Sequence, residues 1–392
     1  MKSRLFTSVF LLSAICSLAQ EETEEQEPKK LTLKGYIKDM ASFNFYGDSL
    51  MLQNLIHNRL NFAWYATNEL TFYMEVRTRL LHGDFVSMIP NYAEIVDSNN
   101  DYFDLSANLI NEKSVILNTM IDRFYLQWAK NNWEIKLGRQ RINWGINLAW
   151  NPNDWFNAYS FFDFDYEERP GSDAVRVSRY TGVASSVEVA AKISDDIDRF
   201  VGAAMWKANK WDYDFQFLGG LAQGDLAAGT GWAGNLGTAS FKGEMTWFHK
   251  VVETVVNPFY EDMFLGAISV DYSFPNSLYL NGSLMFNSEG TSGVPFNFTA
   301  IGLRPGTVRD LSPYRWSGFV QSTYQINPLL YSGLAFIGYP GSKDFFINPS
   351  ITISAMQNLD VYVVAQLFFG RDFNGDFGSV ANSVYLRLKW SF

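Results

Sequence analysis

The sequence ends on Ser383-Val384-Tyr385-Leu386-Arg387-Leu388-Lys389-Trp390-Ser391-Phe392. Its even positions from Val384 to Phe392 are all apolar, whereas its odd positions are polar or amphipathic and include Arg387 and Lys389. Successive side chains of a β-strand point to opposite faces of the sheet. The stretch therefore predicts a strand with one apolar face and one polar, charged face that contacts water.

The same alternation recurs along the chain. Between 70 and 80, Leu70 and Phe72 lie on an apolar face, while Glu75, Arg77 and Arg79 lie on the opposite one. Arg59 and Arg123 likewise alternate with apolar neighbours, and no helical period intervenes. This pattern is typical of an all-β, transmembrane antiparallel β-barrel. About 18 strands are expected, with 16 as the alternative, at 31–44, 54–65, 69–80, 114–128, 133–144, 174–180, 183–193, 199–207, 211–221, 226–234, 238–249, 262–274, 278–287, 314–326, 329–338, 345–356, 361–369 and 380–392.

The first residues have the composition of an export signal. Lys2 and Arg4 precede an uncharged apolar stretch that ends in small residues at Ala19, which predicts a signal peptide over 1–19. Cys16, the only cysteine, leaves with it, so disulfides and zinc–thiolate sites are not expected. Residues 20–30 carry five glutamates and predict an acidic periplasmic linker ahead of a barrel over 31–392.

The composition of the chain narrows its function. Loss of Lys2 and Arg4 with the signal leaves 29 of the 31 basic residues against 41 acidic ones, a net charge of −12. This balance disfavours nucleic-acid binding. Beyond the signal there is no apolar run of about 18 residues, as a membrane-spanning helix would need. Aromatic residues make up 17% of the chain, which fits the interfacial girdles of a barrel.

The terminal strand resembles the closing strand of Gram-negative outer-membrane β-barrels, which end on a phenylalanine. This resemblance implies an outer-membrane location, contact with outer-membrane lipid, and recognition of Phe392 by the barrel-assembly machinery. Short connections such as 66–68, 130–132 and 275–277 are assigned to the periplasmic rim. The long connections are placed outside, and they are 81–113, 145–173, 250–261 and 288–313.

The least generic part of the sequence begins at Gly138-Arg139-Gln140-Arg141, continues through Asn151-Pro152-Asn153-Asp154 and re-enters a strand after Arg169-Pro170-Gly171. It resembles alginate-export-type and related porin-like barrels. If loop 145–173 folds into the barrel, its charges form a constriction with cationic and anionic sides. The cationic residues are Arg139, Arg141, Arg169, Arg176 and Arg179, and they lie beside the acidic residues Asp163, Asp165, Glu167, Glu168 and Asp173. Alternatively, these charges pair among themselves and hold the loop rigid.

Strict alternation from Trp133 would place Arg139 and Arg141 on the lipid side, so a β-bulge at Gly138 is expected to turn them inward. The full set of predicted lumen residues is Arg59, Glu75, Arg77, Arg79, Arg123, Arg139, Arg141, Asp163, Asp165, Glu167, Glu168, Arg169, Arg176 and Arg387.

These residues predict a channel for small polar or anionic solutes, such as oligosaccharides or uronates. The alternative is a structural or interaction barrel, a subunit of a secretion or surface-lipoprotein complex whose lumen is plugged, with a protein partner at loop 81–113. No cofactor or metal site is expected, because the oxygen-rich stretches 97–101 and 372–376 lack the closing Glu of a calcium loop. His57, His82 and His249 are not flanked by a nucleophile motif, so an enzyme is not expected.

Overall fold

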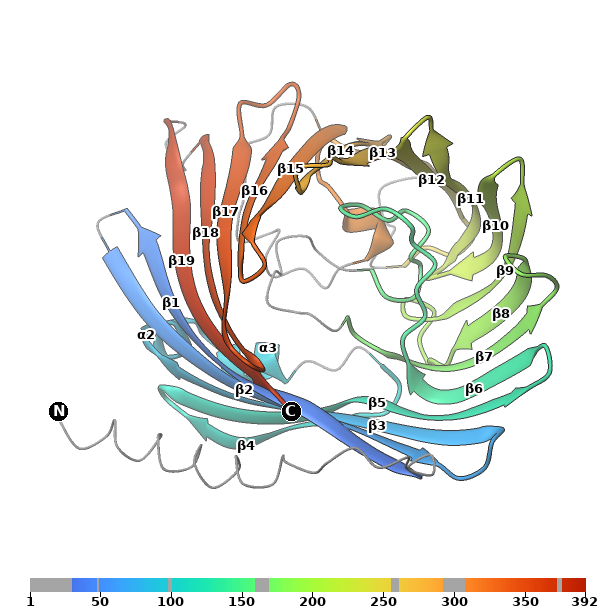
Figure 1. The fold of residues 1–392 in the computed structure, drawn as a ribbon, viewed down its shortest axis with the longest axis horizontal. Coiled ribbons are helices and arrows are strands. Elements are labelled where there is room, and N and C mark those ends of the chain that lie inside the picture. Colours follow the sequence, from blue (N-terminus) through green and yellow to red (C-terminus); the bar gives the residue numbers. More distant parts are fainter. Residues whose placement is uncertain are drawn as a thin grey trace.

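The computed structural model describes residues 30–47, 49–97, 101–158, 169–254, 261–291, 307–371 and 376–392. Nineteen strands form one sheet that closes on itself, and Figure 1 shows them as a ring of neighbouring strands. Their bounds are β1 (Leu31–Tyr46), β2 (Ser49–Tyr65), β3 (Leu70–Gly83), β4 (Ser106–Glu112), β5 (Val115–Lys130), β6 (Trp133–Gln140), β7 (Ser172–Tyr180), β8 (Ser186–Lys192), β9 (Val201–Lys210), β10 (Tyr213–Ala222), β11 (Asp225–Leu236), β12 (Ala239–Lys250), β13 (Asp262–Ser273), β14 (Leu278–Asn287), β15 (Trp316–Asn327), β16 (Leu330–Gly338), β17 (Phe345–Met356), β18 (Leu359–Arg371) and β19 (Phe377–Ser391).

Eighteen of these strands make the closed wall. β3 pairs directly with β5. β4 is a short side strand whose one partner is β5: it pairs with the first half of β5, whereas β6 pairs with the second half. Every pairing in the wall is antiparallel, including the closure of β1 on β19, where Ile37 faces Trp390 and Phe43 faces Val384. The predicted 18-stranded antiparallel barrel is confirmed, and the 16-strand alternative is wrong.

The alternation predicted for the terminal strand holds in the wall. Leu386 and Leu388 are 42% and 43% exposed on the outward face, whereas Ser383 is buried against the lumen side, where its hydroxyl donates to Asn44 Oδ1 at 2.7 Å. Turns of two to five residues join the strands at one end of the barrel, and all the longer connections leave from the other. We call these the short-turn end and the long-loop end. The described chain starts and finishes at the short-turn end, where the Phe392 N–H donates to Gly35 O at 2.9 Å.

Several strand limits differ from the prediction. β2 begins at Ser49 rather than at 54, and β6 ends at Gln140 rather than at 144. β4 was not predicted, and neither were the short helices α2 (Asp84–Met88), α3 (Tyr92–Val96) and η2 (Val308–Asp310). Elements this short carry too few residues to show a period. In the part of the chain that the structure describes, no helix is long and apolar enough to cross a bilayer.

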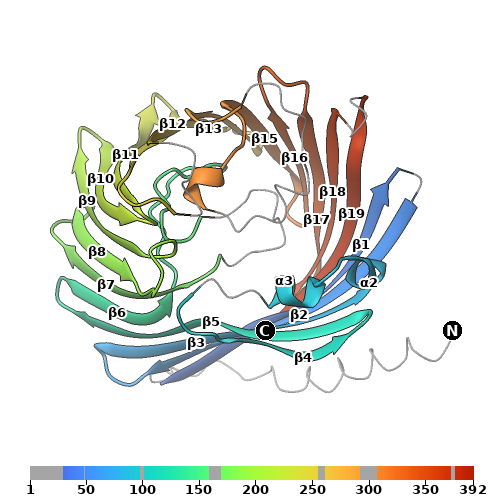
Figure 2. The same ribbon diagram turned by 180° about the vertical axis from the view of Figure 1, so that it is seen from behind.

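Loop 81–113 leaves from the long-loop end, as predicted, but part of it folds back onto the wall. Val86 of α2 and Val96 of α3 are buried against Leu81 and Ile116, whose side chains face the lumen from β3 and β5. Figure 2 shows α3 on the inner side of the ring, next to β2. Burial of these apolar side chains explains the inward fold of the loop.

Candidate channel lining

One segment of the β6–β7 connection crosses the lumen, and we call residues 141–158 the inserted segment. Figure 1 shows its trace inside the ring of strands. Its aromatic side chains Trp144, Trp150 and Trp155 are 2%, 4% and 4% exposed. Trp150 packs on Phe319 of β15, and Trp155 packs on Phe248 of β12. These tryptophans are therefore packing residues that hold the inserted segment against the inner face of the barrel.

Glu244 anchors the inserted segment from the inner face of β12. Its Oε1 accepts the backbone N–H groups of Ile146 at 2.6 Å and Asn147 at 2.9 Å, and its Oε2 accepts the N–H of Asn153 at 2.9 Å. The carboxylate is fully buried. A carboxyl group that accepts three backbone N–H groups is a strong tether, because each of those donors would otherwise be buried without a partner.

Side chains from neighbouring strands add to this tether. Gln216 Nε2 of β10 donates to Trp144 O at 2.9 Å, and Ser269 Oγ of β13 donates to Asn147 Oδ1 at 2.6 Å. Thr246 Oγ1 of β12 lies 2.8 Å from Asn153 Oδ1. The inserted segment is therefore fixed to the β10–β13 side of the lumen.

The opposite side of the lumen carries a concentration of positive charge. We call its six cationic side chains the cationic wall, and they lie on four neighbouring strands: Lys38 on β1, Arg59 on β2, Arg77 and Arg79 on β3, and Arg387 and Lys389 on β19. The register sets like charges directly opposite each other, with Lys38 facing Lys389 and Arg59 facing Arg77. Such pairs repel in a sheet, so they are not explained by strand pairing alone.

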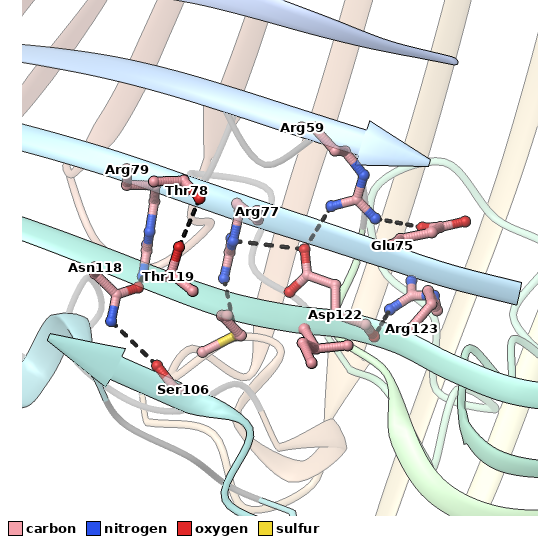
Figure 3. A network of polar contacts seen from close by, with 12 residues as sticks. Arg59, Glu75, Arg77, Thr78, Arg79, Ser106, Asn118, Thr119, Asp122 and Arg123 are labelled. Atoms are coloured by element: carbon pink, nitrogen blue, oxygen red, sulfur yellow. Dashed lines mark hydrogen bonds and ion pairs between the residues drawn. The ribbon is translucent and has the colours of Figure 1, made fainter. Parts of the chain in front are cut away.

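Two carboxylates compensate part of this charge (Figure 3). Arg59 bonds both Glu75 and Asp122, and Arg77 Nε lies 3.5 Å from Asp122 Oδ2. Arg59 is 0% exposed and Asp122 is 3% exposed, which makes this part a buried ionic network. Arg79 donates to Val96 O of α3 at 2.8 Å and to Asn118 Oδ1 at 2.9 Å. The network thus also holds the folded-back loop.

Other predicted lining residues remain partly accessible. The side chain of Glu75 is 25% exposed, and Arg176, which bonds Glu188 at 2.6 Å, is 21% exposed. Arg387 is also half-buried and lies over the Tyr362 ring at 4.6 Å. Lys389 lies over the Tyr36 ring at 4.5 Å. Such cation–π contacts attract each cation to the face of the ring and fix the direction of its side chain.

Arg139 is held differently from the prediction. Pairing runs without a register shift on both sides of Gly138, so the predicted bulge there is wrong, although Gly138 does have φ 117. The irregularity lies instead in the pairing of β5 with β3, where Asp122 of β5 is an extra residue between Ile121 and Arg123. Arg139 directly faces Asp173, which it bonds at 2.8 and 2.9 Å. The two buried side chains are covered by the backbone of Phe103, whose N–H donates to Asp173 at 2.8 Å and whose carbonyl accepts from Arg139.

The remaining predicted charges divide into two groups. Arg123 donates to the carbonyls of Asp122 and Arg169, and the Arg169 side chain reaches Asp154 at 3.4 Å. Arg141 lies near Asp154 and stabilises its charged form. Asp163, Asp165, Glu167 and Glu168 lie outside the described residues. In the described part of the inserted segment, the carboxyl group close to these arginines is that of Asp154, which the sequence did not single out.

Arg309 of η2 is another residue that sequence reasoning missed. It bonds Asp225 at 2.7 and 3.0 Å, Gln223 Oε1 at 2.6 Å and Ala222 O at 2.6 Å, and its guanidinium lies over the Phe248 ring. The arginine therefore fastens the β14–β15 connection to the β10–β11 turn. Its partners lie more than eighty positions away in sequence, so no local pattern indicates the contact.

Comparison with known proteins rests on solved structures, because no family model and no curated protein matches the chain. OccK11 (OpdR) of Pseudomonas aeruginosa matches with a TM-score of 0.57 at 10% identity, covering 96% of this chain and 99% of that chain. OccAB4 of Acinetobacter baumannii matches with a TM-score of 0.57 at 8% identity, covering 94% and 100%. The outer membrane channel DcaP of Acinetobacter baumannii matches with a TM-score of 0.49 at 14% identity, covering 94% and 100%.

The chain has the fold of a porin-like, outer-membrane β-barrel. The likeness extends over almost the whole of both chains and shows this fold alone. Within this barrel, the three histidines do not form a site, because His57, His82 and His249 lie on β2, β3 and β12, and His57 faces the lumen whereas His82 lies on the outward face.

The barrel's inserted segment contains one carboxyl that titrates near neutrality. Burial raises the pKa of Asp154 from 3.8 to about 7, against the opposing effect of Arg169 and Arg141. Asp154 is therefore neutral below about pH 7 and negative above it. We expect the ratio of anion to cation permeability of the barrel to be higher at about pH 5 than at about pH 9, because the negative charge of Asp154 appears in this interval.

Reversal potentials measured in a salt gradient at both pH values test this expectation. Asp154→Asn should weaken the pH dependence, whereas Asp214→Asn at the short-turn end should leave it in place. An unchanged pH dependence in Asp154→Asn would contradict the assignment.

Proposed function

We propose that the protein is an outer-membrane channel for small anionic solutes, which pass between the inserted segment and the cationic wall. The observation that carries the proposal is the register of the wall, in which Lys38 faces Lys389 and Arg59 faces Arg77. Like charges kept opposite each other lower stability. The same facing cations raise the local concentration of anions in the lumen and stabilise an anion as it crosses the barrel.

The accessible part of the wall supplies the contacts for a solute. Arg387 and Lys389 are half-buried rather than enclosed, and Arg176 is accessible from β7. A guanidinium offers a planar pair of donors suited to a carboxylate, and an ammonium offers a point charge. Carboxylated sugars such as uronates combine that charge with hydroxyl groups, and the resemblance of 138–173 to alginate-export-type barrels favours the same class.

Charge reversal in the wall tests the proposal. The double variant Arg387→Glu and Lys389→Glu changes the lumen charge by four units, so we expect the channel to turn from anion-preferring to cation-preferring. It should also lose current block by a monomeric uronate. Neutral hexoses provide the solute control, since their block should be unaffected.

A matched variant separates lumen charge from total charge. Lys130→Glu on β5 and Lys210→Glu on β9, at exposed positions of the short-turn end, make the same change in net charge away from the wall. If both double variants shift the reversal potential equally, the cationic wall does not set the selectivity. If neither the wild type nor the variants conduct, the proposal is wrong.

An interaction barrel remains the second candidate, and one observation favours it. Tyr102, Phe103 and Leu109 of the β3–β5 connection are 51%, 53% and 62% exposed at the long-loop end. A photo-crosslinker at Tyr102 in intact cells should yield a stoichiometric adduct with another protein if this surface binds a partner. Conductance without such an adduct favours the channel.

A further inference from the structure

A small pocket lies in the lumen where β7 to β11 approach the short-turn end. Its volume is about 320 Å³, and Ile146 of the inserted segment and the turn residues 183–185 border it. Small-molecule sites measure roughly 300–1,000 Å³, so this pocket has room for one small solute. In Figure 1, β7 to β11 lie on the other side of the ring from β1 and β19, which carry part of the cationic wall.

Four polar side chains cross the pocket in one row. We call Tyr180, Ser186, Lys207 and Gln216 the vestibule row, and all four line the pocket. The strand register sets Tyr180 opposite Ser186, Ser186 opposite Lys207, and Lys207 opposite Gln216. Side chains directly opposite each other on neighbouring strands lie close together. The row therefore presents a phenol ring, a hydroxyl, an ammonium and an amide on one surface.

The cation of the vestibule row is Lys207. Its side chain is half-buried, and it has no hydrogen bond, ion pair or ring contact in the described part of the chain. Lys136 and Lys242 also face the lumen near the short-turn end, but they pair with Glu134 at 3.3 Å and with Asp271 at 3.2 Å. The Lys207 ammonium is therefore free to bind the carboxylate of a solute.

Gln216 adds an acceptor to the inner side of the pocket. Its Nε2 donates to Trp144 O at 2.9 Å, which fixes the direction of the amide group. Its Oε1 is buried and has no hydrogen-bond partner among the described residues. A buried acceptor without a donor lowers stability. A hydroxyl group that enters the pocket can supply this donor.

The surroundings of the row favour an occupant that offers more than charge. Asp214 also borders the pocket, where its Oδ1 accepts Asn209 Nδ2 at 2.7 Å, and its carboxylate offsets the charge of Lys207. A simple anion therefore gains little from this pocket. Tyr180 is 46% exposed and offers a ring face, to which Ile146 adds apolar surface. A sugar ring matches this surface, because it combines hydroxyl groups with apolar C–H groups.

We propose that the vestibule row is a binding subsite for a single carboxylated sugar ring, such as a uronate. The carboxylate binds the Lys207 ammonium, a hydroxyl group donates to Gln216 Oε1, and the ring lies against Tyr180. This inference rests on the proposed function, because the solute reaches the pocket through the lumen. The subsite is separate from the cationic wall and gives the solute a second contact across the lumen.

Saturation-transfer NMR on the purified protein in detergent measures the binding of D-galacturonate. We expect it to bind at least about tenfold more tightly than D-galactose, which lacks the carboxylate, or acetate, which lacks the hydroxyl groups. Lys207→Gln should weaken galacturonate binding about tenfold, whereas Lys207→Arg should keep most of it. Lys210→Gln is the matched control and should bind like the wild type, because Lys210 lies on the outward face of the same strand, over the Trp211 ring.

The same titration in the Arg387→Glu and Lys389→Glu background separates the subsite from the cationic wall. Lys207→Gln should weaken binding there by the same factor. Unchanged galacturonate binding by Lys207→Gln in both backgrounds would overturn the subsite, even if the reversal potential shows an anion-preferring channel. Equal binding of galacturonate and acetate would overturn it as well. Since binding is measured without current, a protein that binds galacturonate through Lys207 but does not conduct supports the subsite and contradicts the channel.

Discussion

Replacement of Glu244 by leucine is expected to release the inserted segment and to enlarge the single-channel conductance. The change leaves the N–H groups of Ile146, Asn147 and Asn153 without their acceptor. Loss of a buried partner costs about 1–3 kcal/mol for each donor. Even at the lower limit, the sum of about 3 kcal/mol changes the ratio of docked to undocked segment by roughly 100-fold.

Planar-bilayer recording of the purified protein measures this effect. Glu244→Leu should give larger and noisier open currents than the wild type. Glu69→Leu removes the same charge at an exposed short turn, where Glu69 pairs only with Lys130 among the described ion pairs, and it should leave the conductance unchanged. A wild-type conductance for Glu244→Leu would show that the inserted segment does not narrow the path.

Replacement of Asp122 by leucine is expected to give the largest loss of stability. Asp122 compensates Arg59 and lies 3.5 Å from Arg77, and all three side chains are nearly or fully buried. Removing one partner of a buried ion pair costs about 3–5 kcal/mol, because the remaining charge stays in a poorly polar environment. We expect a matching fall in the free energy of unfolding.

Urea unfolding in lipid vesicles, followed by tryptophan fluorescence, gives this free energy. The double variant Arg59→Met with Asp122→Leu should be more stable than Asp122→Leu alone, since it removes the uncompensated charge. Asp214→Asn, at an exposed position that bonds Asn209, is the control and should change stability little. If Asp122→Leu matches this control, the network does not brace the wall.

The wall was predictable because its signal is local. Leu70 and Phe72 alternate with Glu75 and Arg77 within one strand, and the lipid-facing and lumen-facing sides follow from that period alone. Strand limits at loops were less predictable. β6 ends at Gln140, and the backbone that follows it binds Glu244, a residue about a hundred positions later in sequence.

The lining was predictable in residue type but not in arrangement. Arg59, Arg77 and Arg139 were identified from their strands, and Asp173 was among the acidic residues placed beside Arg139. Asp122, however, reaches Arg59 and Arg77 through a register shift on β5 that no local pattern shows. Gly138 illustrates the limit. Its positive φ suits glycine because a Cβ would lie 2.3 Å from Phe124 O, but that conformation does not interrupt the pairing of β6.

The central claim is that anions cross this barrel beside the cationic wall, although the chain as a whole carries a net charge of −10. The reversal potential of the wild-type protein in a potassium chloride gradient tests it most directly. We expect a sign that reports preferential chloride permeation. A cation-preferring reversal potential, or a barrel that passes no current, would contradict the account.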